Sequence, residues 1–176
     1  SNSSVMKAGE AAKLFSNIEQ ILHLHQVLLE NLEKASAEDI HVPFARLHLL
    51  LKIYTSYVNG YGKAIDVVRL NEDNSRFQKF LENACKMSGN GLGLMAYLIM
   101  PVQRIPRYAL LLKQVLKNTT ADKVSTIESL HKALANVENC ATEINERKRR
   151  VDNQMSVLAV QSKLGKSLSS LKGFEL

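Results

Sequence analysis

The segment Tyr97–Thr119, YLIMPVQRIPRYALLLKQVLKNT, decides the fold of this chain. In the chain as a whole, long runs of Ala, Leu, Lys, Glu and Gln favour helix. The apolar residues of this segment recur at steps of three and four, which places them on one face of a helix. That face consists of Val102, Ile105, Ala109, Leu112 and Leu116. The segment therefore predicts a helix that packs into a core.

The opposite face of the same predicted helix is also regularly spaced. It carries Gln103, Arg107, Leu110 and Gln114. Leu110, with Leu111 at the border of this face, would place apolar side chains in solvent beside Arg and Gln. Such a mixture is typical of a protein interface, and Arg is common among residues that dominate binding energy. Spacing alone leaves an ordinary solvated face open as the alternative.

Two prolines interrupt the segment, and they call for different explanations. Pro101 is expected to start the helix, where its missing N–H costs nothing. Pro106 would remove the hydrogen bond to the carbonyl of Val102, at about 3 kcal/mol in an ideal helix interior. We therefore expect a kink at Pro106 that tilts the mixed face relative to the apolar one.

Towards the N-terminus, apolar periodicity predicts two more helices. The first covers Val5–Lys34 as one continuous amphipathic helix. The second begins at Pro43, which suits a first helical turn. Gly60 and Gly62 are expected to bend or break it. Its expected apolar residues are Phe44, Leu47, Leu50, Leu51, Tyr54, Tyr57, Val58 and Tyr61.

A third helix and a long last helix flank the central segment. Ser75 and Gln78 form a capping-box pattern that predicts a helix start at Ser75. Residues 86–93, KMSGNGLG, are expected to form a loop. Residues 127–158 carry a heptad seam broken by Lys148. About 40 helical residues would span about 60 Å, so one end should project from a small bundle.

Together these patterns predict the fold class. No stretch shows sustained period-two alternation, so we expect an all-α, elongated bundle of antiparallel helices over residues 5–165. Residues 166–176 are expected to form a linker. The expected shared core includes Leu112, Leu116, Leu134, Val137 and Ile144.

Composition narrows the possible functions. The net charge is +6, but the densest basic run, Glu146–Arg150, has no aromatic residues nearby and the chain has no Trp, so we expect no nucleic acid partner. The sequence contains no run of about 18 apolar residues, so we expect no insertion into a membrane. Cys85 and Cys140 form no disulfide framework, which favours a reduced, cytoplasmic protein.

The sequence also lacks the patterns of catalysis and cofactor binding. Gly89, Gly91 and Gly93 follow no predicted strand and make no dinucleotide fingerprint. No Cys and His residues have metal-ligand spacing. We expect no catalytic, cofactor or metal site. The histidines are expected to be surface or helix-packing residues: His23, His25, His41, His48 and His131.

Four segments, and their order along the chain, resemble the Dbl-homology (DH) domain, whose members are guanine-nucleotide exchange factors for Rho-family GTPases. LIMPVQRIPRYALLLKQVLKNT resembles its third conserved region, and PFARLHLLLKIYTSYVNGYGKAI, residues 43–65, its middle one. LFSNIEQILHLHQVLLENL, residues 14–32, resembles the segment after the family's first helix. EINERKRRVD, residues 143–152, resembles the start of the family's projecting final segment.

The resemblance implies a mechanism without covalent chemistry. Such a bundle binds both switch regions of a GDP-loaded GTPase of the Rho, Rac or a related type, and it favours the nucleotide-free state. A pleckstrin-homology domain in cis and recruitment to a membrane are also implied.

Motif positions imply the binding residues. Arg107 matches the family's basic residue of the third region, and Asn145 the asparagine of its final helix. Ile99 matches the position that helps to select the GTPase. The complete expected set is Ile99, Gln103, Arg107, Leu110, Gln114, Asn145 and Arg149.

One departure from the family shapes the expected activity. The family's first conserved region supplies a glutamate to the first switch, and Glu10 lies too close to LFSNIEQ to match it. We therefore expect these 176 residues alone to exchange poorly and to self-associate through apolar surface along Leu14, Ile21 and Leu28. Two alternatives remain open: a helical scaffold or docking domain without exchange activity, and a basic bundle that binds anionic membrane.

Overall fold

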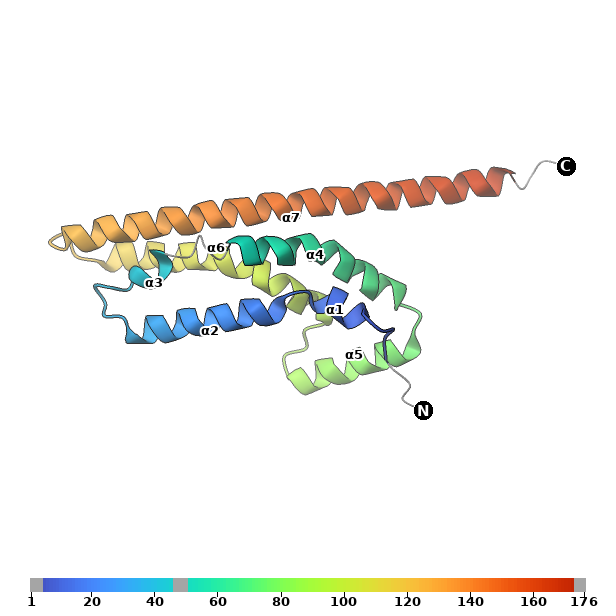
Figure 1. Cartoon of the computed structure of the whole chain (residues 1–176), viewed down its shortest axis with the longest axis horizontal. Coiled ribbons are helices and arrows are strands. Elements are labelled where there is room, and N and C mark those ends of the chain that lie inside the picture. Colours follow the sequence, from blue (N-terminus) through green and yellow to red (C-terminus); the bar gives the residue numbers. More distant parts are fainter. Residues whose placement is uncertain (1–4, 46–50, 173–176) are drawn as a thin grey trace.

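A computed structural model describes residues 5–45 and 51–172, and every regular element in these ranges is an α-helix. The all-α, elongated bundle is therefore confirmed (Figure 1). Leu47, Leu50 and His48 lie outside the described residues. The helices are α1 Glu10–Phe15, α2 Ile18–Lys34, α3 Val42–Ala45, α4 Leu51–Leu70, α5 Ser75–Ser88, α6 Leu94–Asn118 and α7 Val124–Lys172.

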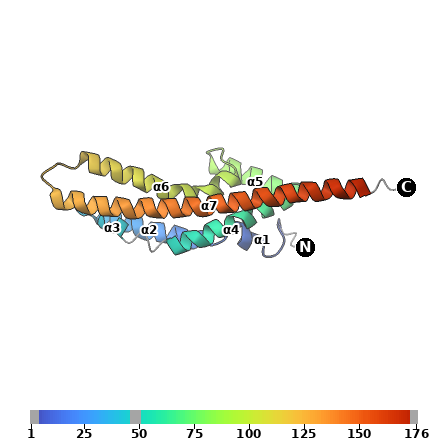
Figure 2. The same ribbon diagram turned by 90° about the horizontal axis from the view of Figure 1, so that it is seen from above.

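The longest helix, α7, forms the axis of the molecule. Its 49 residues correspond to a length of about 74 Å. α6 and α4 pack along it, and its C-terminal part projects beyond the bundle, as expected (Figures 1 and 2). The helix continues through Lys172, so residues 166–172 are helical where a linker was expected. The domain boundary near residue 165 stays a prediction.

The expected continuous N-terminal helix is wrong, because it is divided into α1 and α2. Ser16, between them, adopts a left-handed φ of 49°. The side-chain amide of Asn17 donates a hydrogen bond of 3.0 Å to the carbonyl of Ile53 in α4. A Cβ placed on Gly60 would lie 2.8 Å from Ser16 Oγ. The junction is thus pressed against α4, which explains why the chain turns there.

A bend or a break was expected at Gly60 and Gly62. There is no break, since α4 runs unbroken to Leu70, and a bend there stays a prediction. Both glycines instead permit close approach of neighbours. A Cβ on Gly62 would lie 3.3 Å from Met155 Sδ and 3.3 Å from Val151 Cγ1, both on α7. The two glycines therefore let the α1–α2 junction and α7 pack on α4.

The third helix begins where expected but uses a different cap. Asn74, not Ser75, is the N-cap: its side chain accepts hydrogen bonds from the backbone N–H groups of Arg76 and Phe77, at 3.2 and 3.3 Å. Gln78 donates instead to the carbonyl of Asn71. α5 then extends to Ser88, so only residues 89–93 of the expected loop are outside a helix.

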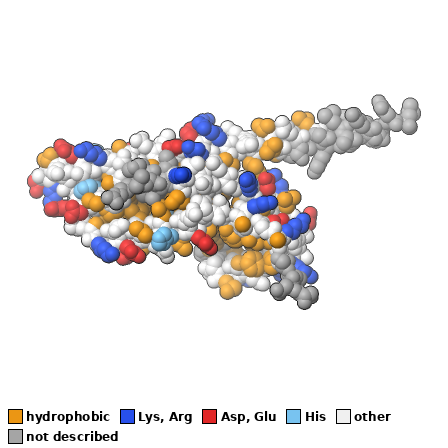
Figure 3. All heavy atoms as spheres, viewed as in Figure 1, with side chains coloured by type: hydrophobic (Ala, Val, Ile, Leu, Met, Phe, Trp, Pro, Cys, Tyr) orange, Lys and Arg blue, Asp and Glu red, His pale blue; other side chains and the backbone are white. Residues whose placement is uncertain are grey.

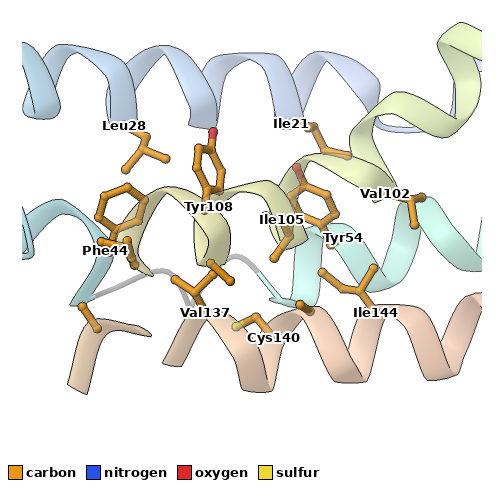
Figure 4. Close-up of a cluster of buried hydrophobic side chains, with 14 of the residues drawn as sticks. Ile21, Leu28, Phe44, Tyr54, Val102, Ile105, Tyr108, Val137, Cys140 and Ile144 are labelled. Carbon is orange, nitrogen blue, oxygen red and sulfur yellow. The ribbon is translucent and has the colours of Figure 1, made fainter. Parts of the chain in front are cut away.

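The core lies between α2, α3, α4, α6 and α7 (Figure 4). Three of the expected shared core residues are almost fully buried: Leu112, Val137 and Ile144. Leu116 and Leu134 are half-buried and pack against this cluster. The apolar face predicted for the central helix is therefore the face that meets α7 and α2.

A polar network inside this core connects three helices through His25 of α2. Its Nε2 contacts Tyr54 Oη of α4 at 2.5 Å, and its Nδ1 contacts Tyr108 Oη of α6 at 2.8 Å. Arg104 Nε donates to Tyr108 Oη at 3.0 Å, and the guanidinium lies 4.8 Å from the centroid of the Tyr108 ring. His25 is thus a helix-packing residue, and its ring joins hydroxyls from two other helices.

The neutral form of His25 fits this network. Burial, and then the positive charge of Arg104, lower the pKa of His25. A neutral imidazole has one donor and one acceptor nitrogen. Because Arg104 donates to Tyr108, the Tyr108 hydroxyl can donate to Nδ1 and Nε2–H can donate to Tyr54. Burial raises the pKa of Tyr54, which keeps that hydroxyl protonated.

We expect the free energy of unfolding to fall as the pH decreases below about 6.5, the ordinary pKa of His25. The folded-state pKa is lowered, so the unfolded chain takes up a proton that the folded chain resists, and the stabilisation present above 6.5 is lost towards the folded-state pKa. Urea unfolding from pH 7.5 to pH 5 measures this. His25→Gln should flatten the dependence, whereas His23→Gln, an exposed control on the same helix, should keep it. Equal slopes in both variants would contradict the assignment.

Candidate functional site

The mixed face of α6 is exposed along its whole length. Gln103, Arg107 and Gln114 are exposed, and Leu110 keeps 63% of its surface in solvent. Leu111 beside it is 55% exposed. The periodicity of the sequence therefore predicted correctly which side of this helix faces away from the core.

Both prolines lie inside α6, so the expectation that Pro101 starts the helix is wrong. The helix begins at Leu94, and Gly93 precedes it without a side-chain cap. The helix continues through Pro106, and the kink expected there stays a prediction. Apolar packing from Leu98 onwards stabilises a helical segment that proline alone would disfavour.

The N-terminal half of α6 is anchored to α4. Tyr57 Oη donates a hydrogen bond of 2.8 Å to the carbonyl of Leu98, and burial raises the pKa of Tyr57 to about 12. Ile99, next in the chain, is half-buried and packs against both apolar clusters of the molecule. Ile99 therefore has a role in packing, and its role in binding stays a prediction.

The two predicted binding residues of α7 are exposed. Asn145 follows the buried Ile144 directly. Arg149 forms an ion pair of 2.8 Å with Glu146 and is 68% exposed. That ion pair lowers the pKa of Glu146. An exposed pair of this kind contributes little to stability, so Arg149 can exchange it for another partner.

α6 and α7 run antiparallel and side by side (Figure 2). Lys113 of α6 and Glu138 of α7 form an ion pair of 2.8 Å between them. Val102 and Ile105 of α6 pack in the same cluster as Ile144 of α7 (Figure 4). Within the described residues, no hydrogen bond joins Gln103, Arg107, Leu110 or Gln114 to Asn145 or Arg149.

Lys148, the residue that interrupts the heptad seam, has a structural explanation that the sequence did not reveal. Its Nζ lies 2.6 Å from Asp152 Oδ2 and 5.3 Å from the centroid of the Tyr61 ring. The aliphatic part of such a side chain can cover apolar surface while its charged end is paired. The lysine is thus accommodated where α7 crosses α4.

The expected exposed surface along Leu14, Ile21 and Leu28 is wrong, because all three are buried. The neighbouring leucines on α2 are exposed instead: Leu22 at 58% and Leu29 at 55%. Leu14 of α1 packs in the cluster that includes Tyr61 and Leu98. Ile21 and Leu28 fill the face of the amphipathic α2 that belongs to the main core. The exposed apolar surface of α2 is therefore formed by Leu22 and Leu29. Each of them follows a buried residue by one position, which is about 100° around the helix.

Leu22 belongs to an apolar groove of about 410 Å³ between α2 and α6. Its wall on α6 includes Tyr97, Met100 and Arg104, and His25 lies in its lining. A second, smaller groove continues along Leu22, Leu29 and Arg104. Exposed apolar surface of this continuity is typical of a binding site for a helix or another protein.

The described residues hold neither a cluster of metal ligands nor a membrane-spanning helix. In residues 5–45 and 51–172, no group of three His, Cys, Asp or Glu side chains could hold a metal ion. No helix in these ranges is sufficiently long and apolar to cross a membrane.

Comparison with known proteins agrees with the bundle and its motifs. The chain is 33% identical over 166 residues to Rac guanine nucleotide exchange factor JJ of Dictyostelium discoideum, which covers 91% of this chain and 14% of the relative. It is 32% identical over 161 residues to human FYVE, RhoGEF and PH domain-containing protein 4, covering 87% of this chain and 21% of the relative. The chain thus spans a small part of the length of these relatives.

Solved structures share the fold. The apo structure of the activated truncation of Vav1 superimposes with a TM-score of 0.76 at 25% identity, covering 89% of this chain and 41% of that one. The DH domain of FARP2 gives 0.68 at 22% identity, covering 90% and 80%, and so supports the fold alone. The model of the RhoGEF domain family matches residues 1–145. The resemblance to DH domains is confirmed, and the chain belongs to the RhoGEF domain family.

Proposed function

We propose that this domain is a guanine-nucleotide exchange factor for a Rho-family GTPase, and that it binds the switch regions with the mixed face of α6 and the adjacent part of α7. The observation that carries the proposal is the exposed strip Gln103, Arg107, Leu110 and Gln114 on α6 of a RhoGEF fold, in which the neighbouring helix α7 carries the exposed Asn145. Relatives named as exchange factors for Rac support the reaction class.

The chemistry of this strip suits recognition without bond making. Arg107 is exposed and forms no ion pair within the described residues, so its planar guanidinium is available to a carboxylate or backbone carbonyl. Leu110 offers an apolar anchor between polar neighbours, and Asn145 offers an amide that can donate and accept. A surface that binds the empty GTPase more tightly than the GDP-loaded one shifts the population towards nucleotide release.

The proposal includes a neighbouring domain and a location for the whole protein. A pleckstrin-homology domain after α7 and recruitment of a cytoplasmic protein to a membrane would be consistent with it, and the solved DH/PH domains of p115-RhoGEF have the same fold. The second candidate function is a docking domain without exchange activity, and the open groove between α2 and α6 favours it. GDP release from a panel of Rho-family GTPases distinguishes the two.

The first test of the interface is charge reversal at Arg107 and truncation at Asn145. Losing one partner of a buried, charged hydrogen bond costs about 2–5 kcal/mol of binding, so Arg107→Glu should weaken binding to a nucleotide-free GTPase more than tenfold. Asn145→Ala should weaken it less. Both residues are exposed, so thermal melting should change by no more than about 2 °C. Titration calorimetry and fluorescent GDP release measure these effects.

Lys132→Glu is the matched control for this test. Lys132 is an exposed cation on α7 towards the end of the helix away from Asn145, and its reversal should leave affinity within about twofold of the parent. If Arg107→Glu and Asn145→Ala bind like Lys132→Glu, or if both unfold, these two residues do not form the interface.

Ile99 provides a test of selectivity. We expect Ile99→Ala to change the order of preference among Rho-family GTPases, because its exposed part would pack against the partner. Ile105→Ala is the comparison: Ile105 is 1% exposed, and such a core truncation costs about 2–5 kcal/mol of stability. Exchange assays on the panel, with melting curves, separate the effects. An unchanged order with a lowered melting temperature would show that Ile99 is only a packing residue.

The groove between α2 and α6 predicts self-association of the isolated chain. Apolar side chains with more than half of their surface in solvent favour burial against a second copy. The double change Leu22→Glu and Leu29→Glu should therefore give a monomer by light scattering where the parent shows a mass that rises with concentration. Leu70→Glu, at a leucine that is 79% exposed on α4, should behave like the parent. A parent that is monomeric at all concentrations would refute this expectation.

A further inference from the structure

Helix α5 lies at the periphery of the molecule and has two distinct apolar sides. In Figure 1 it lies apart from α7, on the opposite side of the molecule from that helix. One side holds it to the bundle: Phe77 is fully buried, and Leu81 and Cys85 are half-buried. The other side carries Phe80, which is 52% exposed, and Met87, which is 88% exposed. The fold therefore uses only one of the two apolar sides.

The exposed side is a regular row. Phe80 and Met87 are seven residues apart, which places them about 20° apart around the helix and about 10 Å apart along it. Ala84, also exposed, lies between them on the same side. Hydrophobic side chains are visible on the molecular surface in the part of the molecule where α5 lies (Figure 3). Such a row serves no purpose in the core, since Phe77 already anchors the helix.

Positive charge borders this apolar row on its solvent side. Arg76 lies one turn before Phe80, and Lys79 and Lys86 form a parallel row about 100° away around the helix. All three cations are exposed, and none of them forms an ion pair within the described residues. The single acid of α5, Glu82, falls about 150° from the apolar row. Further acids, Glu72 and Asp73, lie in the turn that precedes the helix.

We propose that α5 is a peripheral membrane-contact helix, which adsorbs to an anionic phospholipid surface with Phe80 and Met87 at the headgroup boundary and Arg76, Lys79 and Lys86 on the lipid phosphates. An apolar row flanked by Lys and Arg is the pattern of helices that lie in the membrane interface. Each cation near an anionic leaflet adds to the attraction. None of these residues lines the groove between α2 and α6, and the row suits a flat lipid layer better than a protein ligand that needs a groove.

This inference is independent of exchange activity, and it differs in place from the groove between α2 and α6. The net charge of +6 made anionic membrane one of the functional classes that the sequence left open. The structure adds a specific location, because cations and exposed apolar side chains coincide on α5. In this arrangement the bundle would contact the membrane by its short helix, with α7 and the mixed face of α6 left free.

The chain has no Trp, so a single introduced Trp reports on one position. Phe80→Trp should show a blue shift of emission with vesicles of phosphatidylserine and phosphatidylcholine, and no shift with phosphatidylcholine alone. High salt should reverse the shift, because screening weakens charge attraction. Val124→Trp, at an exposed valine at the start of α7, is the control and should not shift. Equal shifts at both positions, or with neutral vesicles, would overturn the proposal.

Two double variants test the residues by vesicle sedimentation. Phe80→Ser with Met87→Ser, and Lys79→Glu with Lys86→Glu, should each lower the bound fraction at least tenfold in apparent affinity. Melting curves should stay close to the parent, since the buried Phe77 is unchanged. Lys132→Glu, which alters net charge away from α5, should reduce binding by less than twofold. Binding that survives both double variants, or that falls equally with Lys132→Glu, would overturn the assignment to α5.

Discussion

The packing of α6 against α7 is the constraint on which the rest of the structure depends. Ile105 and Leu112 of α6 and Val137 and Ile144 of α7 are each at most 1% exposed and belong to one cluster. Once this face of α6 is buried, its mixed face must point to solvent, because the two are on opposite sides of the helix. The candidate interface is therefore a geometric consequence of the core.

The polar atoms of the core add direction to this packing. The contacts of His25 with Tyr54 and Tyr108 join α2, α4 and α6, and Tyr57 joins α4 to the backbone of α6. Hydrophobic burial is non-directional, whereas these bonds require one rotation of each helix. They help to fix which side of α6 faces away from the core.

The sequence predicted the helical class, the core face of α6 and its exposed opposite face, because these follow from a period that a helix enforces. It failed where tertiary contact decides. Gly60 and Gly62 predicted a bend or a break, but the helix is unbroken and the two glycines accommodate Ser16 and Met155, which no local pattern reveals. Pro101 was placed at a helix start, although packing keeps it inside α6. The hydrogen bonds of His25 join residues far apart in the chain, so periodicity along one helix could not reveal them.

The length of α7 has a consequence for whatever follows Lys172. Beyond Met155, which lies beside Gly62 of α4, the helix extends for about 25 Å to Lys172. A straight helix transmits orientation as well as distance: each residue added to this part would rotate the following segment by about 100° and advance it by about 1.5 Å. The number of residues in the projecting part of α7 would therefore set both the distance and the direction of a domain attached to its end.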